Sequence, residues 1–221
     1  MTRTDLPFYR LRAWLFSPIK RSIDIVSALL LLIIFSPILI IVIIVMKLSS
    51  PGPVIFKQKR VGQVGEFYMY KFRSMRTGDN DKFLKENYPD LWEKYKKNDW
   101  KLSASEDPRI TPIGRFIRST SIDEMPQFIN VLKGEMSLVG PRAYRDTELK
   151  EYAQKYPQTK KYIKIIRTAK PGITGLWQVS GRNDLSFEKR AKMDADYIKN
   201  RSIRQEIAII FKTPMAMISP W

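Results

Sequence analysis

The 221-residue sequence contains neither cysteine nor histidine. These two absences exclude disulfides, thiolate metal sites, cysteine or Ser-His nucleophiles and imidazole general bases. Any catalysis by this chain must therefore use carboxylate, lysine or tyrosine side chains. Any bound metal must be a hard cation held by oxygen ligands, and Mg²⁺ is the obvious candidate if phosphates are involved.

Acidic residues are also scarce relative to basic ones. The chain has 22 Asp plus Glu against 39 Lys plus Arg, which gives a formal net charge of +17. Such a surface attracts phosphate-bearing partners, and nucleic acid, anionic lipid and nucleotide substrates all fit this description. The hydrophobic share of 44% is enough to build a globular core.

One long apolar segment is present, and no second one follows it. Residues 25–46 are 22 consecutive positions without a formal charge, and 17 of them are Ile, Leu, Val or Phe. As a helix this segment would be about 33 Å long, against a hydrocarbon core of about 30 Å. Its insertion is favourable by about 7 kcal/mol. We therefore expect the segment to enter a membrane, in preference to acting as a cleavable signal peptide, because no small-residue cleavage site follows it.

Two features favour a bent, re-entrant helix over a simple span. Ser36 and Pro37 lie near the middle of the apolar segment, and proline removes a backbone donor and bends helices. Both flanks are basic, with Lys20 and Arg21 before the segment and Lys47 after it, so both read as cytoplasmic. A tolerated bend in a spanning helix is the alternative. Residues 1–19 mix aromatic and arginine side chains and suit the lipid headgroup level, with a frayed tail as their alternative.

The remainder, residues 49–221, is expected to form one catalytic domain at the membrane surface. Residues 54–57 and 66–72 predict a small β-hairpin, and the polar stretch 77–107 predicts a solvated insertion with short helices. Helices are predicted at 113–118, 124–133, 146–156, 186–199 and 203–211. The expected fold is α+β and mostly helical, with the membrane segment 20–48 forming a helix, a break at Ser36-Pro37 and a second helix.

Asp123 and Glu124 are the first candidates for chemistry. They stand at the predicted start of a helix, where free N–H groups favour an anion, and Arg118 lies close by in sequence as a phosphate clamp. Aspartate can act as a covalent nucleophile toward phosphorus. The alternative is structural, because Ser121 with Glu124 matches a capping box and acidic residues at a helix start are routine.

Two Gly-containing stretches form the second group of candidates. Arg142 follows a Gly-Pro turn, and residues 170–183 interleave glycines with Lys170, Trp177, Gln178 and Arg182. Glycines allow backbone amides to approach a phosphate, and a planar indole can stack on a base. The stretch lacks the order of a Walker loop or a Rossmann fingerprint. A buried Gly-rich crossing loop with Trp177 in the core is the competing interpretation.

Taken together, these stretches resemble the monotopic phosphoglycosyl transferases, bacterial sugar transferases that initiate glycan assembly on polyprenol phosphate. The resemblance runs over roughly residues 20–211, and several distant motifs occur in the right order. The matching motifs are residues 20–24, 35–37, 58–62, 70–75, 118–126, 130–134, 137–142 and 170–183.

The resemblance implies a function, a mechanism and a site. A sugar 1-phosphate would pass from a UDP-sugar to undecaprenyl phosphate through a covalent phosphosugar on Asp123, with release of UMP. Glu124 would assist as metal support or as a base, and Mg²⁺ would bridge the two carboxylates and the diphosphate. Substrate binding is assigned to Lys71, Arg73, Arg118, Arg142, Lys170, Gln178, Arg182 and Asn183, while Lys20 and Arg21 are assigned to lipid headgroups.

The resemblance also implies a setting at the cytoplasmic face of the bacterial inner membrane. The product would start an O-antigen, capsule, exopolysaccharide or glycoprotein glycan that downstream glycosyltransferases extend. No nucleic-acid partner is expected, and a homodimer is left open. Ala143 and Lys170 depart from the family, which commonly has Pro and Arg there. We expect a small-form enzyme or a fragment of a larger one. The alternative function is a membrane-anchored basic module that binds lipid or nucleic acid without catalysis.

Overall fold

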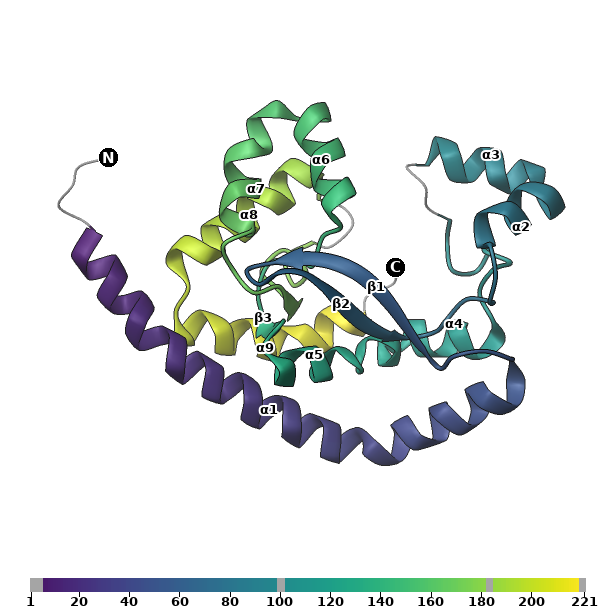
Figure 1. Cartoon of the computed structure of the whole chain (residues 1–221), viewed down its shortest axis with the longest axis horizontal. Helices are drawn as coiled ribbons and strands as arrows, with labels where there is room; N and C mark the ends of the chain where they lie inside the picture. The colour runs from purple at the N-terminus through teal and green to yellow at the C-terminus, as the bar shows by residue number, and fades with distance from the viewer. Residues whose placement is uncertain (1–5, 99–101, 182–184, 219–221) are drawn as a thin grey trace. The chain divides into compact units, whose positions relative to one another are not determined.

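The computed structural model describes residues 6–98, 102–181 and 185–218, and most of them are helical (Figure 1). This confirms the predicted mostly helical fold with a small hairpin. The helices are α1 (Leu6–Ser49), α2 (Asn80–Asn87), α3 (Pro89–Lys97), α4 (Pro112–Ser119), α5 (Gln127–Lys133), α6 (Asp146–Lys155), α7 (Lys160–Ile166), α8 (Phe187–Asn200) and α9 (Ile203–Ile218), with the 3-10 helices η1 (Ile122–Glu124) and η2 (Pro157–Thr159). The strands are β1 (Ile55–Gly62), β2 (Gly65–Phe72), β3 (Ser137–Val139) and β4 (Gly172–Thr174).

The described residues belong to two compact units. Unit 1 contains α1 up to Ile33, residues 58–69 and the chain from Gln127 onward. Unit 2 contains residues 34–57 and 70–126. The domain boundaries predicted after residues 19 and 48 stay predictions.

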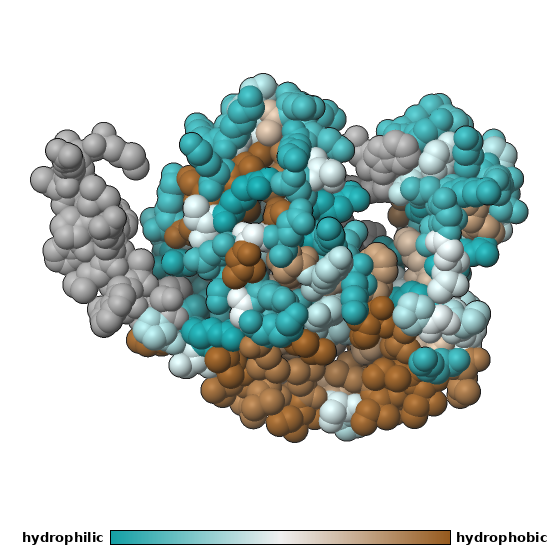
Figure 2. All heavy atoms as spheres, viewed as in Figure 1, coloured by the Kyte–Doolittle hydropathy of each residue, from teal (hydrophilic) through white to brown (hydrophobic). Residues whose placement is uncertain are grey.

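Helix α1 carries the apolar segment. Within Pro18–Ser49, the most apolar stretch of 18 residues has a mean hydropathy of 3.4, and only 11% of that stretch is buried, so this part of α1 is long and apolar enough to cross a membrane. Ile33, Ile34 and Leu48 are among its exposed side chains. Figure 2 shows apolar atoms gathered on the face of the molecule that carries this helix. Such an exposed apolar surface marks a membrane-facing or partner-facing helix.

The predicted break at Ser36-Pro37 is not present as a gap between two helices. Both residues lie inside the continuous helix α1. Proline lacks only its own N–H donor, and an apolar helix can absorb that loss by bending without ending. A re-entrant path through the bilayer stays a prediction, and labelling residues 1 and 221 from each side of the membrane would test it.

Two small sheets are present in the part of the chain that the structure describes. Strands β1 and β2 pair with each other and confirm the predicted hairpin, with β1 extending to Gly62. Strands β3 and β4 form a parallel pair that was not predicted. Glycine is required at this second sheet, because a Cβ on Gly172 would lie 2.1 Å from the backbone nitrogen of Gly140. The two chain segments therefore cross at a distance that excludes a side chain.

Each unit has its own apolar core. In unit 1, helices α6, α7 and α8 lie beside one another (Figure 1) around Tyr144, Leu149 and Phe187. In unit 2, the core contains Ile122 of η1 together with residues of α1, β2 and α4. Ile122 is 6% exposed, so its burial fixes the short turn that carries Asp123 and Glu124, called the dyad below.

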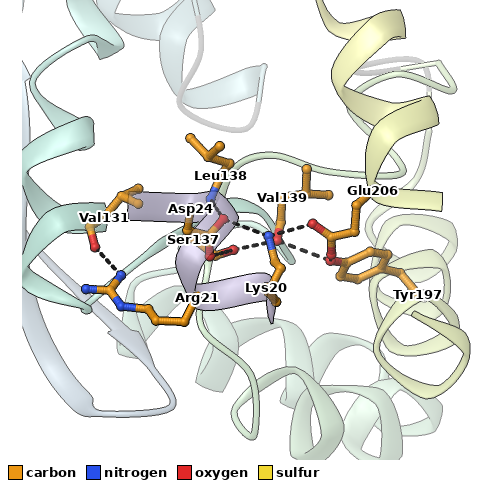
Figure 3. A network of polar contacts seen from close by, with 9 residues as sticks. All are labelled: Lys20, Arg21, Asp24, Val131, Ser137, Leu138, Val139, Tyr197 and Glu206. Carbon is orange, nitrogen blue, oxygen red and sulfur yellow. Dashed lines mark hydrogen bonds and ion pairs between the residues drawn. The ribbon is translucent and has the colours of Figure 1, made fainter. Parts of the chain in front are cut away.

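A buried polar network joins residues 20–24 of α1 to the rest of unit 1 (Figure 3). The Asp24 carboxylate is 2% exposed and accepts hydrogen bonds from Lys20 Nζ and Ser137 Oγ, each at 2.8 Å, and from the Leu138 N–H at 3.0 Å. Lys20 Nζ also forms an ion pair with Glu206 of α9. A buried charge is stable only when it is paired and hydrogen-bonded, and this one is both.

Two further contacts extend this network. Tyr197 Oη of α8 donates to Glu206 and lies 3.1 Å from the Val139 carbonyl oxygen. The Arg21 guanidinium donates to the carbonyls of Val131 and Leu132 at 2.6 and 2.9 Å. These carbonyls belong to the last turn of α5, where a cation also complements the helix dipole. Residues 20–24 of α1 are thus bonded directly to α5, β3 and α9, and Glu206 connects them to Tyr197 of α8.

Substitution Asp24→Asn is expected to destabilise unit 1. The amide cannot balance the charge of Lys20, so the free energy of unfolding should fall by about 2–4 kcal/mol. Thermal unfolding of the detergent-solubilised protein measures this change. Glu86→Gln is the control, because it breaks only the exposed 3.8 Å pair with Lys82 and should cost less than about 0.5 kcal/mol. Equal shifts in the two variants would contradict a stabilising role of the network.

Candidate functional site

Asp123 and Glu124 lie on η1, a single 3-10 turn, and not at the start of a long helix. The capping box, which was the structural alternative for this motif, is not formed. Ser121 has φ 55, in the left-handed region, and its side chain makes no cap hydrogen bond. An N-cap residue needs extended backbone, which this conformation does not provide. Met125 and Pro126 separate η1 from α5, which begins only at Gln127.

The electrostatic environment of Asp123 combines burial with nearby cations. Burial raises the pKa of its carboxyl group to about 6, and the negative charge of Glu124 acts in the same direction. The charges of Lys71 and Arg118 lower this pKa and limit the rise. Asp123 is therefore mostly ionised at pH 7 but more basic than a solvated aspartate. A carboxylate of this kind can act as a nucleophile or accept a proton.

Lys71 is the most direct partner of the dyad. Its Nζ lies 2.6 Å from Oε1 of Glu124, and both side chains are about a quarter to a third exposed. The amine therefore remains accessible from solvent while it orients Glu124. Arg118 stands in the last turn of α4. Together these two cations place positive charge beside Asp123, where a phosphate group would need it.

The pair Asp123 and Glu124 fits a Mg²⁺ ion that takes its remaining ligands elsewhere. Among the described residues, no group of three or more acidic side chains could hold a metal ion. Mg²⁺ commonly binds through one or two carboxylates, with water and substrate phosphates completing its shell. One carboxylate here is already paired with Lys71. The dyad could therefore hold Mg²⁺ jointly with a bound diphosphate, but the described chain offers no closed protein cage for it.

Arg73, another predicted substrate contact, is turned toward the chain itself. It is 7% exposed, donates to the Pro51 carbonyl, and lies 3.0 Å from the Ser50 carbonyl through its second guanidinium nitrogen. These carbonyls follow the end of α1, so Arg73 closes the turn that leaves the apolar helix. We leave Arg73 out of the site proposed below.

The remaining predicted site residues that the structure describes belong to unit 1. Arg142 follows β3 and its N–H donates to Asp194 at 3.2 Å. Gln178 donates to the Ile173 carbonyl at 3.1 Å. Trp177 is 3% exposed, so its indole is not a platform for a base, and the interpretation as a core residue is the correct one. Arg182 and Asn183 lie outside the described residues.

Lys170 lies close to Arg21. A Cβ placed on Gly134 would be 3.5 Å from the Arg21 guanidinium and 3.6 Å from Lys170 Nζ. Burial lowers the pKa of Lys170, and the positive charge of Arg21 lowers it further. Lys20, Arg21 and Lys170 line one pocket of unit 1. The predicted headgroup role of Lys20 and Arg21 stays a prediction, because their described contacts are with the protein.

Sequence reasoning missed two polar residues of α8 that contact this region. Arg190 lies over the Trp177 ring, and Asp194 is fully buried and contacts Arg142. The sequence contained one signal that could have identified this region, namely the position of Asp194. It shares a helical face with Phe187 and Ala191, which are buried, and an acidic residue on an apolar helix face needs a polar partner.

Comparison with known proteins places the chain in a family. The family model for bacterial sugar transferases matches residues 15–220. The undecaprenyl-phosphate galactose phosphotransferase of Salmonella typhimurium is 44% identical over 90% of this chain, and the UDP-glucose:undecaprenyl-phosphate glucose-1-phosphate transferase of Escherichia coli is 40% identical over 88%.

The chain spans only about two fifths of these two relatives, 40% and 39% of their lengths. A shorter relative, the exopolysaccharide production protein ExoY of Sinorhizobium fredii, is 38% identical over 88% of the chain, and the match covers 83% of that protein. The family match over nearly the whole chain, with the carboxylate pair beside Lys71 and Arg118, leads to one conclusion: the chain belongs to the bacterial sugar transferase family.

Proposed function

We propose that this protein is a phosphoglycosyl transferase that moves a sugar 1-phosphate from a UDP-sugar to undecaprenyl phosphate. It would act at the cytoplasmic face of the bacterial inner membrane, with α1 inserted in the bilayer. Family membership and the names of two relatives support transfer to undecaprenyl phosphate. One name specifies galactose and the other glucose, so the names do not identify the sugar that this protein transfers.

The observation that carries the proposal is the state of Asp123. It is a partly buried carboxylate with a raised pKa, flanked by the cations Lys71 and Arg118. A soluble, fully hydrated carboxylate is a poor nucleophile, and partial burial raises its basicity. The two cations offset the repulsion between this carboxylate and an incoming diphosphate.

The proposed reaction has two displacements at the same phosphorus atom. An Asp123 carboxylate oxygen forms a bond to the β-phosphorus of the UDP-sugar, the bond from that phosphorus to the bridging oxygen breaks, and UMP leaves with the electron pair. A phosphate oxygen of undecaprenyl phosphate then attacks this phosphorus. The bond to Asp123 breaks, and the carboxylate returns to its starting state.

The other residues of unit 2 support these two steps. Lys71 and Arg118 would stabilise charge on the phosphate oxygens, and Glu124, held by Lys71, would orient or deprotonate the acceptor phosphate. Mg²⁺ bound by the dyad and the diphosphate would supply further charge neutralisation. Arg142, Lys170, Gln178, Arg182 and Asn183 stay proposed substrate-binding residues.

A donor screen tests the function. Purified protein with Mg²⁺ and undecaprenyl phosphate is incubated with a panel of UDP-sugars, and we expect one or more donors to release UMP. Asp123→Asn should reduce turnover by about a thousandfold or more, because it removes the nucleophile. The control Asp90→Asn changes an exposed acid on α3 and should retain activity. If none of the UDP-sugars released UMP, the result would contradict the proposal and favour a non-catalytic lipid-binding or nucleic-acid-binding module.

The first displacement should depend on the ionisation of Asp123. Its pKa is raised to about 6, chiefly by burial, so the nucleophilic form is lost as the pH falls through 6. Below that pH, the rate of the first UMP release without acceptor should fall about tenfold per pH unit. Leaving out undecaprenyl phosphate removes the titration of the acceptor from the measurement.

A variant tests whether Asp123 causes the fall in rate at low pH, which is the acidic limb of the pH profile. Lys71 lowers the pKa of Asp123, so Lys71→Gln should move the midpoint of the limb to higher pH. Lys85→Gln removes an exposed charge from α2 and should leave the midpoint unchanged. An identical midpoint in the wild type and in Lys71→Gln would show that a different group titrates.

A further inference from the structure

Two guanidinium groups of unit 1 lie over one buried indole. The Arg142 guanidinium carbon is 5.7 Å from the Trp177 ring centroid, and that of Arg190 is 5.3 Å from it. Trp177 is buried, whereas both arginines are partly exposed. Cation–π contacts of this kind hold a guanidinium in place while leaving its N–H donors available. The indole thus brings two accessible cations from separate chain segments to one place.

These two charges have no carboxylate counterion within the described parts of the chain. Asp194 is a buried acid close to both arginines, and its Oδ2 accepts from the Arg142 N–H at 3.2 Å and from Tyr144 Oη at 3.4 Å. Its contacts therefore use backbone and hydroxyl donors. Burial raises the pKa of Asp194 to about 8, so it is mostly neutral at pH 7. The corner of unit 1 formed by Arg142, Trp177, Arg190 and Asp194 consequently carries two positive charges and little negative charge.

The same corner contains several buried polar atoms without a partner. Seven buried side-chain nitrogen or oxygen atoms lack a hydrogen bond among the described residues, and four of them belong here. They are Trp177 Nε1, Gln178 Oε1, Arg190 Nε and Asp194 Oδ1. Native proteins satisfy nearly all such atoms, so a concentration of them indicates a place that a ligand or bound water completes.

We propose that Arg142 and Arg190 together bind a phosphate-ester anion, with Trp177 and Asp194 as positioning residues. Guanidinium groups present paired donors that match phosphate oxygens, and two of them balance a dianion. The Trp177 ring contacts both guanidinium groups, and Asp194 accepts from the backbone N–H of Arg142 shortly after β3. Arg190 is the new member of the site. The assignment of this anion to the donor diphosphate or the acceptor phosphate rests on the proposed function.

Substitution Arg190→Gln tests this site. Loss of one charge-assisted contact should raise the KM for the UDP-sugar or for undecaprenyl phosphate by about tenfold to a hundredfold. The substrate whose KM rises identifies the source of the phosphate. Arg190→Lys should recover part of the affinity, because the charge remains but the paired donors do not. The control Lys192→Gln removes an exposed charge from the same helix and should change neither KM.

Direct binding separates this inference from the proposed function. Calorimetric titration of the detergent-solubilised protein with inorganic pyrophosphate should show binding that Arg190→Gln weakens by at least about tenfold, at an unchanged unfolding midpoint. This result would support the site even if no UDP-sugar released UMP. Unchanged pyrophosphate affinity together with unchanged values of both KM would overturn it.

Asp194 has its own test as a positioning residue. Asp194→Asn keeps an oxygen that accepts from the Arg142 N–H and resembles the neutral acid, so ligand affinity should remain within about threefold of wild type. Asp194→Ala removes this acceptor and should weaken the same ligand that Arg190→Gln weakens. Equal losses in the Asn and Ala variants would show that Asp194 does not act through this hydrogen bond.

Discussion

The buried carboxylate of Asp24 is the interaction on which the arrangement of unit 1 depends. It precedes the apolar segment by one residue, so an acid stands where α1 changes from polar to apolar surroundings. Its three hydrogen bonds come from α1 itself and from the two residues that begin β3. Through Lys20 the same network reaches Glu206 of α9. The membrane-facing helix and the loop that carries Arg142 are therefore held by one electrostatic unit, which water would weaken if it were exposed.

Unit 2 solves a different electrostatic problem around Asp123. In the proposed mechanism, Asp123 has to remain ionised without repelling the diphosphate of the substrate. Burial favours the neutral acid, whereas Lys71 and Arg118 favour the carboxylate, and the outcome is a pKa close to 6. The ion pair between Lys71 and Glu124 keeps a cation next to the dyad. The sequence contains no histidine, so the proposed mechanism relies on this balance and uses no imidazole base.

Periodicity predicted most of the helices and the hairpin, because long helices and alternating strands leave local signals. The resemblance named Asp123, Lys71 and Arg118, which the structure brings together in unit 2, and their roles stay predictions. Local signals failed where tertiary contacts decide. A break was expected at Ser36-Pro37, where the structure has a continuous helix. The capping box considered as an alternative at Ser121 is excluded by its left-handed backbone. The burial of Trp177 and its contact with Arg190 depend on segments distant in sequence, as does the pairing of the three-residue strands β3 and β4. Of these features, only Asp194 could have been identified from the local sequence, because it is an acidic residue on an apolar helix face.

The central claim is that Asp123 carries the phosphosugar between donor and acceptor. Intact-protein mass spectrometry after incubation with the active UDP-sugar and Mg²⁺, without undecaprenyl phosphate, tests it most directly. The account predicts a mass increase of one sugar phosphate that maps to the Asp123 peptide, is absent in Asp123→Asn and disappears when undecaprenyl phosphate is added. UMP release that requires both substrates, with no adduct at any time, would contradict it and indicate direct transfer in a ternary complex.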